Sequence, residues 1–409
     1  LTKIIGEGID GGTISTKTAG TGNLILGSTA GDSIASGGDN NTCVGRNAGT
    51  AITTGVQNIL IGGLAGDALT DADYNVAIGY GALSSDTQGS NSVAIGRFAL
   101  VSQNLTSATN SQNTAVGYNS GNAVTTGTKN TFLGARAGDG TDDGASNVAV
   151  GYLALSGNCG DDNVAIGESA LEVTTAGGNV AIGVNAGKAV AGGEGNVIIG
   201  VNAGDAITSG QDNVIIGRLA GTYQANLTTS NGNVLIGPYN DSTDGTTAYA
   251  HGLGYNLDCA PGYTTFGLGG DDIRAAHGNT SWATVSDERY KKDIVDSTAG
   301  LSFINALKPR TFKYKNLGEL PETFKAYKAN STDVYKNSNT NHGFIAQEVK
   351  TAIDADSSIK DGFKLWDDRP DGSQEVAEAA LIPVLTKAVQ ELSTALDAAV
   401  ARIKKLEDG

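Results

Sequence analysis

The chain has 409 residues, of which 59 are glycine and 17% are charged, and its formal net charge at pH 7 is −16. This acidic balance disfavours contact with the phosphate backbone of nucleic acids, and no apolar stretch approaches the roughly 20 residues of a membrane-spanning helix. We therefore expect a soluble protein with no nucleic-acid partner and no membrane insertion. Because the sequence starts at Leu1 and contains no Met, we also expect an N-terminal attachment region upstream of it.

The three cysteines, Cys43, Cys159 and Cys259, lie far apart and form no CxxC pair. This spacing indicates neither a zinc site nor a disulfide framework. We expect buried or incidental thiols, and we predict no metal and no cofactor for the chain.

Residues 21–240, which follow a lead-in at residues 1–20, consist of thirteen short units that begin with Asn and end with Gly. A representative unit is Asn75–Gly79 (Asn-Val-Ala-Ile-Gly), and the closing glycines recur about every 17 residues. A fixed period of this length is typical of a solenoid, and frequent glycines suit its tight corners. The repeats therefore predict a parallel β-solenoid.

Each unit reads as a short strand with a large-small-large pattern. Alternation along a strand sends Val76 and Ile78 to one face and Ala77 to the other. We expect thirteen such strands to bury a continuous Val/Ile column in a rod of roughly 60 Å, and to leave the small Ala face free to approach another backbone. The leading Asn suits either a left-handed backbone or a ladder of stacked amides along the rod.

Other parts of each repeat also recur. After the glycine comes a second fixed element such as Asn47-Ala48-Gly49, which implies a second buried position in each coil. The segments between units are rich in Thr, Gly, Asp and Ser, and these are expected to be surface turns.

The repeats resemble the Asn-x-Val-Ala-Ile-Gly repeats in the heads of trimeric autotransporter adhesins, and related repeats in phage and other viral fibres. This resemblance covers about residues 20–240. It implies a left-handed β-roll built by three chains.

Residues 241–285 form a Gly-rich connector or tip that contains more aromatic side chains than the repeats. Receptor or glycan contact and packing at the end of the rod both remain open for these rings. The candidates for receptor binding are Tyr249, Tyr255, Tyr263 and Trp282, because an aromatic ring combines an apolar face with a polar end.

Two histidines, His251 and His277, lie in the same connector. They would hold a metal only by meeting their own copies on a threefold axis, since neither belongs to a cluster with ligand spacing.

Residues 286–409 have a different character and read as a small α+β domain. The pattern predicts a helix over 297–307, a strand over 311–314 and a helix over 344–352. From residue 379 to 408 apolar residues recur at alternating spacings of three and four, which predicts a coiled coil that joins several copies of the chain. Its seam consists of Ile382, Leu385, Val389, Leu392, Leu396, Ile403 and Leu406.

Four ordered motifs in this region occur at Ser286–Ile294, Leu307–Tyr314, Gly343–Val349 and Leu381–Leu385. Together they resemble the self-cleaving intramolecular chaperone domain of endosialidase tailspikes and phage tail fibres. The resemblance implies a domain that trimerises and drives the folding of the β-structured fibre upstream. It also implies that the domain then cuts itself off just before the motif serine, through a Ser/Lys dyad.

Carried over to this chain, the resemblance makes Ser286 the nucleophile, Lys291 the general base and Val285–Ser286 the scissile bond. Lys292 is the rival base, and Asp287 either caps the following turn or orients the dyad. A serine hydroxyl needs a base near neutrality, and a lysine serves once desolvation lowers its pKa. Because the dyad is five residues apart, its geometry must come from a bend or from a neighbouring chain. The role of His342, structural or catalytic, stays open.

Taken together, the fold class that we predict is mainly β: a trimeric parallel β-solenoid or β-roll of about 17-residue repeats, then an α+β chaperone domain that ends in a trimeric coiled coil. The predicted function is the distal region of a homotrimeric viral tail fibre or spike, assembled in the host cytoplasm. In the virion it would contact a host cell-surface receptor or glycan, and other tail proteins through the region upstream of the sequence.

Two other functions remain possible. A cellular trimeric surface adhesin would need a membrane anchor. A polysaccharide depolymerase would need paired carboxylates beside an aromatic-lined groove.

Overall fold

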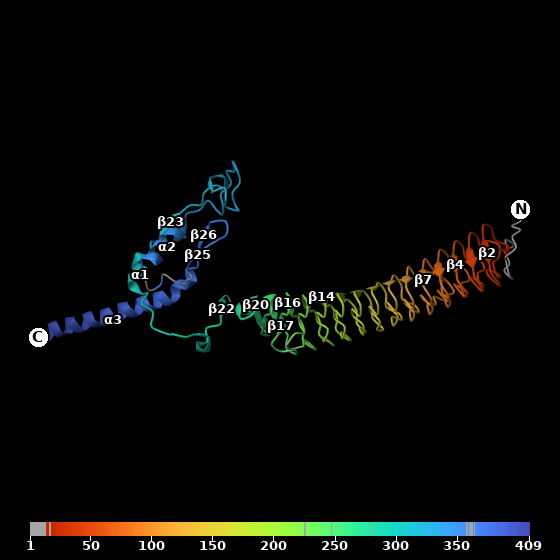
Figure 1. The fold of residues 1–409 in the computed structure, drawn as a ribbon, viewed down its shortest axis with the longest axis horizontal. Coiled ribbons are helices and arrows are strands. Elements are labelled where there is room, and N and C mark those ends of the chain that lie inside the picture. The colour runs from red at the N-terminus through yellow and green to blue at the C-terminus, as the bar shows by residue number, and fades with distance from the viewer. Residues whose placement is uncertain are drawn as a thin grey trace. The chain divides into compact units, whose positions relative to one another are not determined.

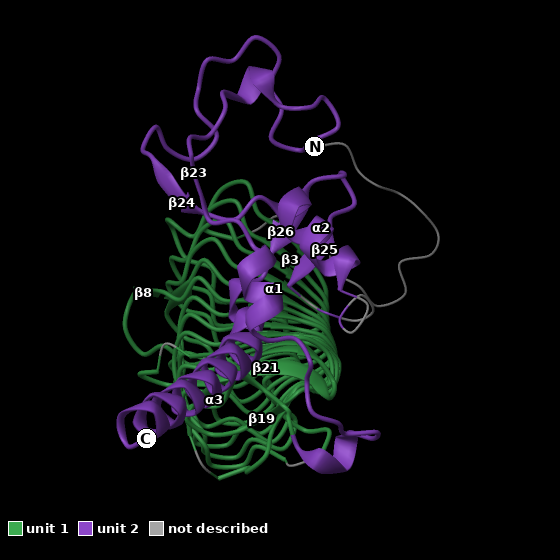
Figure 2. Ribbon diagram, turned by 90° about the vertical axis from the view of Figure 1, so that its left-hand side faces the viewer, with its two compact units in different colours: residues 1–286 green, residues 287–409 purple. Residues whose placement is uncertain are grey.

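The computed structural model describes residues 14–15, 18–224, 226–246, 248–279, 281–356, 359, 363 and 365–409. Most of the lead-in at residues 1–20 therefore lies outside the described residues. The chain divides into two units, residues 1–286 and residues 287–409, which Figure 2 colours separately. Each unit is considered by itself.

Unit 1 is a parallel β-solenoid with coils of about 17 residues, as the sequence predicts (Figure 1). Strands of successive coils pair in parallel and in register, so that Val76 lies opposite Val93 and Ala77 opposite Ala94. The described coils contain thirteen of these three-residue strands: β2 (Leu24–Leu26), β3 (Thr42–Val44), β4 (Ile59–Ile61), β5 (Val76–Ile78), β7 (Val93–Ile95), β9 (Thr114–Val116), β10 (Thr131–Leu133), β11 (Val148–Val150), β12 (Val164–Ile166), β13 (Val180–Ile182), β14 (Val197–Ile199), β15 (Val214–Ile216) and β16 (Val234–Ile236).

The parallel stack meets an antiparallel strand at each end. At one end β1 (Ile14–Ser15) pairs antiparallel with β2. At the other end β18 (His251–Tyr255) and β20 (Tyr263–Leu268) continue the parallel stack, and β21 (Asp271–Ala276) and β22 (Ala283–Thr284) then reverse it. Short two-residue strands pair beside the main sheet: β6 (Gly89–Ser90) with β8 (Thr109–Asn110), and β17 (Asp241–Ser242) with β19 (Asp258–Cys259).

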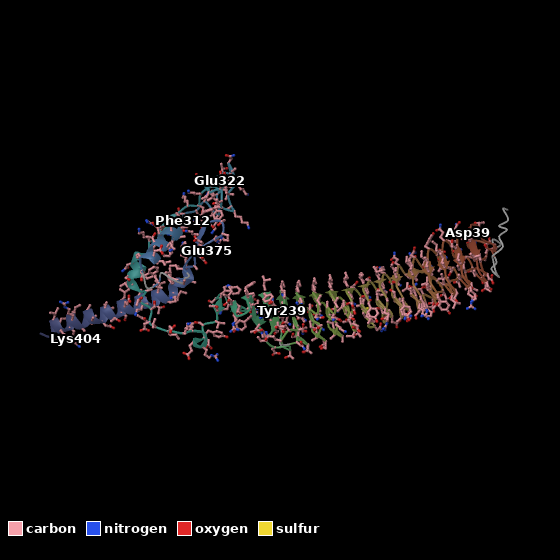
Figure 3. The ribbon with its side chains drawn as sticks, viewed as in Figure 1. Asp39, Tyr239, Phe312, Glu322, Glu375 and Lys404 are labelled. Carbon is pink, nitrogen blue, oxygen red and sulfur yellow. The ribbon has the colours of Figure 1, made fainter. Side chains whose placement is uncertain are left out.

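The expectation that the Val/Ile column fills the rod is wrong, because the middle residue of each strand is the one that points inward. Ala77, Ala94 and Ala149 are fully buried, whereas Ile59 is 41% exposed and Leu133 is 49% exposed. The outward residues line the outer face of the sheet. Figure 3 shows rows of side chains that project from the solenoid along its length.

The narrow interior of a coil explains this arrangement. Besides the inward strand residue, most coils bury the alanine of the post-glycine element, such as Ala65, and often one larger residue, such as Leu69. A Cβ added at Gly66 would lie 2.7 Å from a methyl of Leu60 and 2.8 Å from a methyl of Leu69, so the interior has no spare volume. The second buried position per coil is thereby confirmed, and no room remains for the outward pair.

The leading asparagines form a buried ladder of amides along the rod. This was one of the two roles expected for them. In the coil of Asn130, the side-chain Oδ1 accepts a hydrogen bond from the backbone N–H of Asn147 at 2.9 Å, and Nδ2 donates to the carbonyl of Gly144 at 2.8 Å. The backbone N–H of Asn130 in turn donates to Oδ1 of Asn113 at 2.9 Å. The fully buried members include Asn41, Asn58, Asn75, Asn130, Asn147, Asn163, Asn179, Asn196, Asn213 and Asn233.

The left-handed backbone conformation occurs at the residue before the ladder asparagine, for example at Gln57 and Tyr74, with φ of 58° and 59°. The alternative role for the ladder asparagines is therefore wrong at these positions.

The ladder is interrupted at Ser92, and other buried polar groups replace the missing amide. The side chain of Gln103 donates to Oγ of Ser92 at 2.9 Å and to a carboxylate oxygen of Asp86, and it accepts from Nδ2 of Asn113 at 2.8 Å. Asp86 and Gln103 are fully buried. A longer coil therefore keeps its polar interior satisfied with side chains from its own turns.

The closing glycine of each unit is required by close contact between coils. Gly134 has φ of 138°, and a Cβ there would lie 2.6 Å from the carbonyl oxygen of Gly151 in the next coil. A side chain at this position would both strain the backbone and separate the two coils.

Unit 2 is a small α+β arrangement. Its helices are α1 (Leu301–Ala306), α2 (Ala346–Ala355) and the 27-residue α3 (Leu381–Glu407), with 3-10 turns η1 (Glu288–Tyr290), η2 (Leu317–Glu319) and η3 (Glu378–Ala380). Two antiparallel strand pairs accompany them: β23 (Arg310–Phe312) with β24 (Asn341–Gly343), and β25 (Trp366–Asp368) with β26 (Gln374–Val376). The core gathers Phe303, Val349, Ile353, Leu365, Leu381 and Val384.

The predicted elements of unit 2 exist with shifted bounds. Helix α1 starts at Leu301, where the backbone N–H donates to Oε2 of Glu391 on α3 at 2.8 Å, a tertiary contact invisible in local sequence. Helix α2 begins two residues later and ends three residues later than predicted, and β23 begins one residue earlier. None of the described helices combines the length and the apolar character that crossing a bilayer requires.

Replacing Asn130 by Ala should lower the free energy of unfolding of the solenoid by about 2–3 kcal/mol, because it strands the buried N–H of Asn147 and the carbonyl of Gly144. Urea unfolding followed by circular dichroism measures this loss. Thr126→Ala, at an exposed turn of the same coil, is the matched control and should change the value by less than about 0.5 kcal/mol. Equal stability of the two variants would contradict the structural role of the ladder.

Candidate functional site

The predicted cleavage point lies in exposed chain at the C-terminal end of unit 1. Strand β22 pairs with β21, with Thr284 opposite Ile273, and so ties this segment to the solenoid. Val285 and Ser286 follow directly and are exposed, and Asp287 is the first residue of unit 2. The Val285–Ser286 bond therefore lies in accessible backbone one residue after the final described strand of the solenoid unit.

Asp287 caps the turn that follows it, one of the two roles predicted for it. Its Oδ1 accepts a hydrogen bond from the backbone N–H of Arg289 at 2.8 Å, at the start of η1. Nη2 of Arg289 also lies 2.6 Å from Oδ2 of Asp287. The hydrogen bond from the Arg289 side chain, assisted by the backbone bond, holds the pKa of Asp287 below its ordinary value. Sequence reasoning missed Arg289, although an acid and a base two residues apart in a turn signal such a pair.

Ser286 and Lys291 lie on either side of η1, a single 3-10 turn. The backbone N–H of Lys291 donates to the carbonyl of Glu288 at 2.9 Å and closes the turn. Ser286, Lys291 and Lys292 are all exposed. Since a lysine acts as a general base only when it is desolvated, further protein must cover this segment for the dyad chemistry.

The same segment exposes several large apolar side chains, which sequence reasoning did not single out. Tyr290 is 81% exposed and Val295 is 85% exposed, and Val285 and Ile294 are also exposed. Clustered exposed apolar side chains mark an interaction surface. Their alternation with the charges of Asp287, Lys291 and Lys292 hides this pattern in the sequence.

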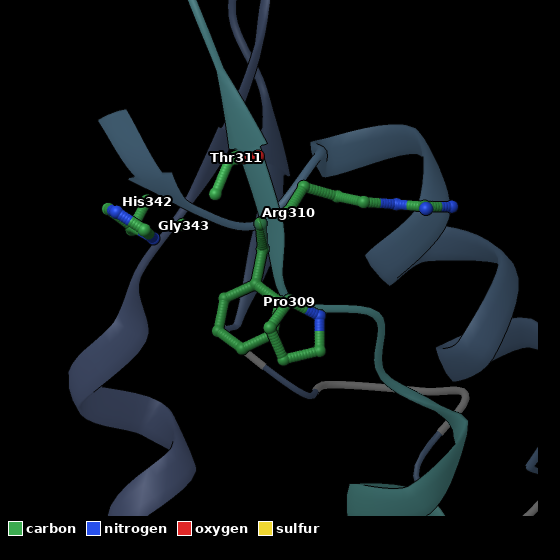
Figure 4. A pocket seen from close by; sticks show the side chains of 6 residues that line it. Pro309, Arg310, Thr311, His342 and Gly343 are labelled. Atoms are coloured by element: carbon green, nitrogen blue, oxygen red, sulfur yellow. The ribbon is translucent and has the colours of Figure 1, made fainter. Parts of the chain in front are cut away.

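His342 lies at a shallow pocket of about 410 Å³ in unit 2 (Figure 4). The pocket is lined by Pro309, Arg310, Thr311, His342, Gly343 and Phe344. Pairing of β23 with β24 sets Thr311 opposite His342. The Arg310 side chain points away toward α2, where its Nε lies 2.9 Å from Oε2 of Glu348. The motifs Leu307–Tyr314 and Gly343–Val349 therefore meet at this pocket. His342 lies beside them on strand β24.

The four aromatic candidates for receptor binding have separate neighbours. Tyr255 makes an edge contact with Tyr239 at 5.6 Å between ring centroids, Tyr263 lies under Arg274 at 5.1 Å, and Trp282 packs on Phe266 at 5.3 Å. Tyr249 packs over Gly232. Among the described residues, no ring contact joins two of the four candidates.

The two histidines of the connector meet within one chain, with ring centroids 4.5 Å apart. Burial, followed by repulsion from His277, lowers the pKa of His251. Within the described residues no group of three metal-ligating side chains is present.

The three cysteines are free and buried, as expected. Burial raises the pKa of Cys43 and that of Cys259 to about 12, so these thiols are poor nucleophiles.

Helix α3 presents two faces. Leu381, Val384 and Ala388 are buried against the rest of unit 2, and α1 packs against α3. The predicted seam lies on exposed positions: Ile382, Leu385, Val389, Leu392, Leu396, Ile403 and Leu406 are all at least 45% exposed, together with Val400, which the prediction omitted. An apolar stripe of this length on a helix is typical of a coiled-coil strand without its partners.

Comparison with known proteins supports the C-terminal assignment. Residues 286–356 match the family model described as chaperone of endosialidase. Searches of curated proteins and of solved structures gave no match. The matched segment starts at Ser286 and includes η1, β23, β24 and α2. The chain therefore carries an endosialidase-type intramolecular chaperone domain, an autoproteolytic type that is typical of phage tail fibres and spikes, C-terminal to a β-solenoid.

Proposed function

We propose that this chain is the distal region of a homotrimeric viral tail fibre or spike that attaches to the host surface. Its C-terminal domain drives trimer folding and then cuts itself off at Val285–Ser286. One observation carries the proposal: the match to the chaperone family begins at Ser286, two residues after the final described strand of the solenoid unit. This arrangement favours a viral fibre over a cellular adhesin.

The stripe on α3 supports assembly into trimers. Its exposed side chains follow an a/d pattern from Ile382 to Leu406, and apolar residues at these positions associate helices in register. A parallel bundle of three α3 helices would bring three solenoid chains to the same starting point. This lowers the entropic cost of pairing strands that are distant along the chain.

The outer face of the solenoid supports the same assembly. Leu26, Ile61, Leu133, Ile166 and Ile182 lie on outward strand positions and are at least 36% exposed. In the register of the sheet they form one apolar surface along the coils. We propose that this surface, and not the Ala face, contacts the other two chains.

The cleavage chemistry uses the residues of the exposed junction. Oγ of Ser286 attacks the carbonyl carbon of Val285 while Nζ of Lys291 takes the hydroxyl proton. The C–N bond then breaks, the proton passes to the new amino group of Ser286, and water hydrolyses the resulting ester. Lys292 is the alternative base. The neighbouring chains would cover Tyr290 and Val295, both exposed in one chain, and so desolvate the lysine after assembly.

Attachment is assigned to the side chains of the solenoid unit. Tyr249, Tyr255, Tyr263 and Trp282 are the proposed contacts to a host receptor or glycan, and Tyr249, Tyr255 and Trp282 are at least 48% exposed. Other virion tail proteins would bind upstream of the sequence. Cleavage after folding would remove the route back to the unassembled state and trap the trimer kinetically.

Ser286→Ala should abolish scission and leave the trimer intact, because it removes the nucleophile and no apolar contact. Intact mass and native mass of the purified proteins give the result, with a fragment that begins at Ser286 expected in the wild type alone. Ser281→Ala, at an exposed serine of the same segment, should be cut normally. Cleavage of the Ser286→Ala variant would exclude Ser286 as nucleophile.

Leu392→Asp should give aggregated chains, since a charge in the middle of the seam opposes helix association. Thr394→Asp adds the same charge two residues away, off the a/d seam, and should still give trimers. Size-exclusion chromatography with light scattering distinguishes the two. A soluble trimer from Leu392→Asp would argue against a chaperone role for α3.

Ile182→Lys should reduce the trimer fraction without unfolding the coils, because this outward side chain on β13 is exposed in one chain and covered in the proposed trimer. Val173→Lys, at an exposed turn position of the neighbouring coil, is the control and should remain trimeric. Native mass spectrometry and circular dichroism report the two properties separately. Equal trimer fractions for the two variants would remove the sheet face from the proposed interface.

A further inference from the structure

One edge of the solenoid has an unusual composition. It is formed by the two residues that follow the closing glycine of each strand unit. All four arginines of residues 18–240 lie there, and so do five of the eight aromatic residues of that range: Arg46, Arg97, Arg136 and Arg218, with Tyr80, Phe98, Tyr118, Tyr152 and Tyr239. Residues 1–286 contain 23 acidic and 9 basic residues, and four of these nine basic residues lie on this edge, which also carries Glu168.

The middle part of this edge, which we call the aromatic edge, consists of Tyr80, Arg97, Phe98, Tyr118, Arg136 and Tyr152. The rings of Tyr80 and Phe98 make an edge contact at 5.6 Å between centroids. Cζ of Arg97 lies 4.4 Å from the ring centroid of Phe98 and 5.8 Å from that of Tyr118. Tyr80, Tyr118 and Tyr152 are nonetheless 47–49% exposed. The rings and the guanidinium thus form one surface that still faces outward.

The backbone holds this row in place. The N–H of Phe98 donates to the carbonyl of Tyr80 at 3.0 Å, and the N–H of Arg136 donates to the carbonyl of Tyr118 at 2.8 Å. Successive coils are spaced by about 4.8 Å, so the row from Tyr80 to Tyr152 is a rigid track with a regular repeat. A preformed track of this kind binds a repetitive ligand with little loss of its own conformational freedom.

The chemistry of the row points to one class of ligand. Aromatic faces pack against the C–H faces of sugar rings, and phenol hydroxyls exchange hydrogen bonds with sugar hydroxyls. Among the described residues, no carboxylate forms an ion pair with Arg97, whereas Arg136 pairs with Asp139 at 2.6 Å. The guanidinium of Arg97 is therefore available to a carboxylate of the ligand.

The density of negative charge distinguishes a suitable polysaccharide from a nucleic acid. A nucleic acid carries about one negative charge per 1.7 Å of duplex, and most of that charge would face the acidic surface around the edge. A polysaccharide with one carboxylate per repeating unit places its charge near Arg97 and presents neutral sugars to the tyrosines.

We propose that the aromatic edge binds an acidic polysaccharide whose sugars carry carboxylate groups. The inference rests on the attachment role proposed above and names the class of its ligand. Sugar rings would lie over Tyr80, Tyr118 and Tyr152, and a carboxylate would pair with Arg97. The edge borders the outward sheet face, so the ligand would run along the solenoid beside the neighbouring chain of the trimer.

The test measures binding of the purified trimer to a panel of immobilised bacterial surface polysaccharides that contain uronic or sialic acids. Each polysaccharide is also presented after chemical reduction of its carboxylates to alcohols. We expect binding to acidic members and at least a tenfold loss on their reduced forms. We expect the same loss for Arg97→Gln and for Tyr118→Asn. Tyr74→Asn, at a tyrosine of similar exposure off this edge, should bind as the wild type does.

The controls separate the possible failures. Native mass establishes whether each variant is a trimer, and loss of the trimer in Arg97→Gln or Tyr118→Asn would reassign the edge to a contact between chains and overturn the inference. Wild-type trimer that adsorbs to bacterial cells but to no polysaccharide of the panel would contradict the inference and leave the attachment role standing. Wild-type protein that is monomeric, or that adsorbs to no strain in a broad panel of bacteria, would contradict the proposed function itself.

Discussion

The structure of unit 1 depends on a single repeated interaction, the buried hydrogen bond that passes from one asparagine to the next coil. Each ladder amide accepts a hydrogen bond from a backbone N–H of the next coil, and most also donate one to a backbone carbonyl, as Asn130 does. Because a buried amide without partners is costly, the ladder permits only one register between coils. The strands themselves are only three residues long, and they could not set this register alone.

An exact register converts sequence repeats into surfaces. Every position of the unit becomes a column, so the inward residues make a tightly filled interior and the outward pairs make a mostly apolar face. The residues after the glycine make a third column with its own aromatic and basic character. Three surfaces with different chemistry therefore arise from one repeated unit.

The sequence was informative wherever the relevant interaction is local or periodic. The repeat period, the amide ladder, the second buried position and the apolar stripe that α3 exposes all follow from spacing. Which strand residues point inward could not be predicted from spacing. A period of two separates the two faces of a strand but does not say which face is inside. In the structure the narrow interior of the coil takes Ala77. The start of α1 at Leu301 depends on Glu391, ninety residues away.

The same limit applies to the candidate site. The motif around Ser286 was recognisable, and the capping role of Asp287 followed from residue type. The partner Arg289 and the exposed apolar side chains Tyr290 and Val295 became evident only in the structure. Lys291 is exposed on the far side of η1 from Ser286.

The antiparallel strands at the two ends of the parallel stack have a consequence for how the protein behaves in a crowded cell. An open parallel stack offers unpaired backbone donors and acceptors at each end, and such ends can add further chains indefinitely, as amyloid fibrils do. Strand β1 reverses direction against β2, and β21 and β22 reverse direction after β20. Each reversal occupies the free edge with a strand of the wrong polarity for continued stacking. We expect these reversed strands to disfavour the addition of further parallel strands at the ends of the described stack.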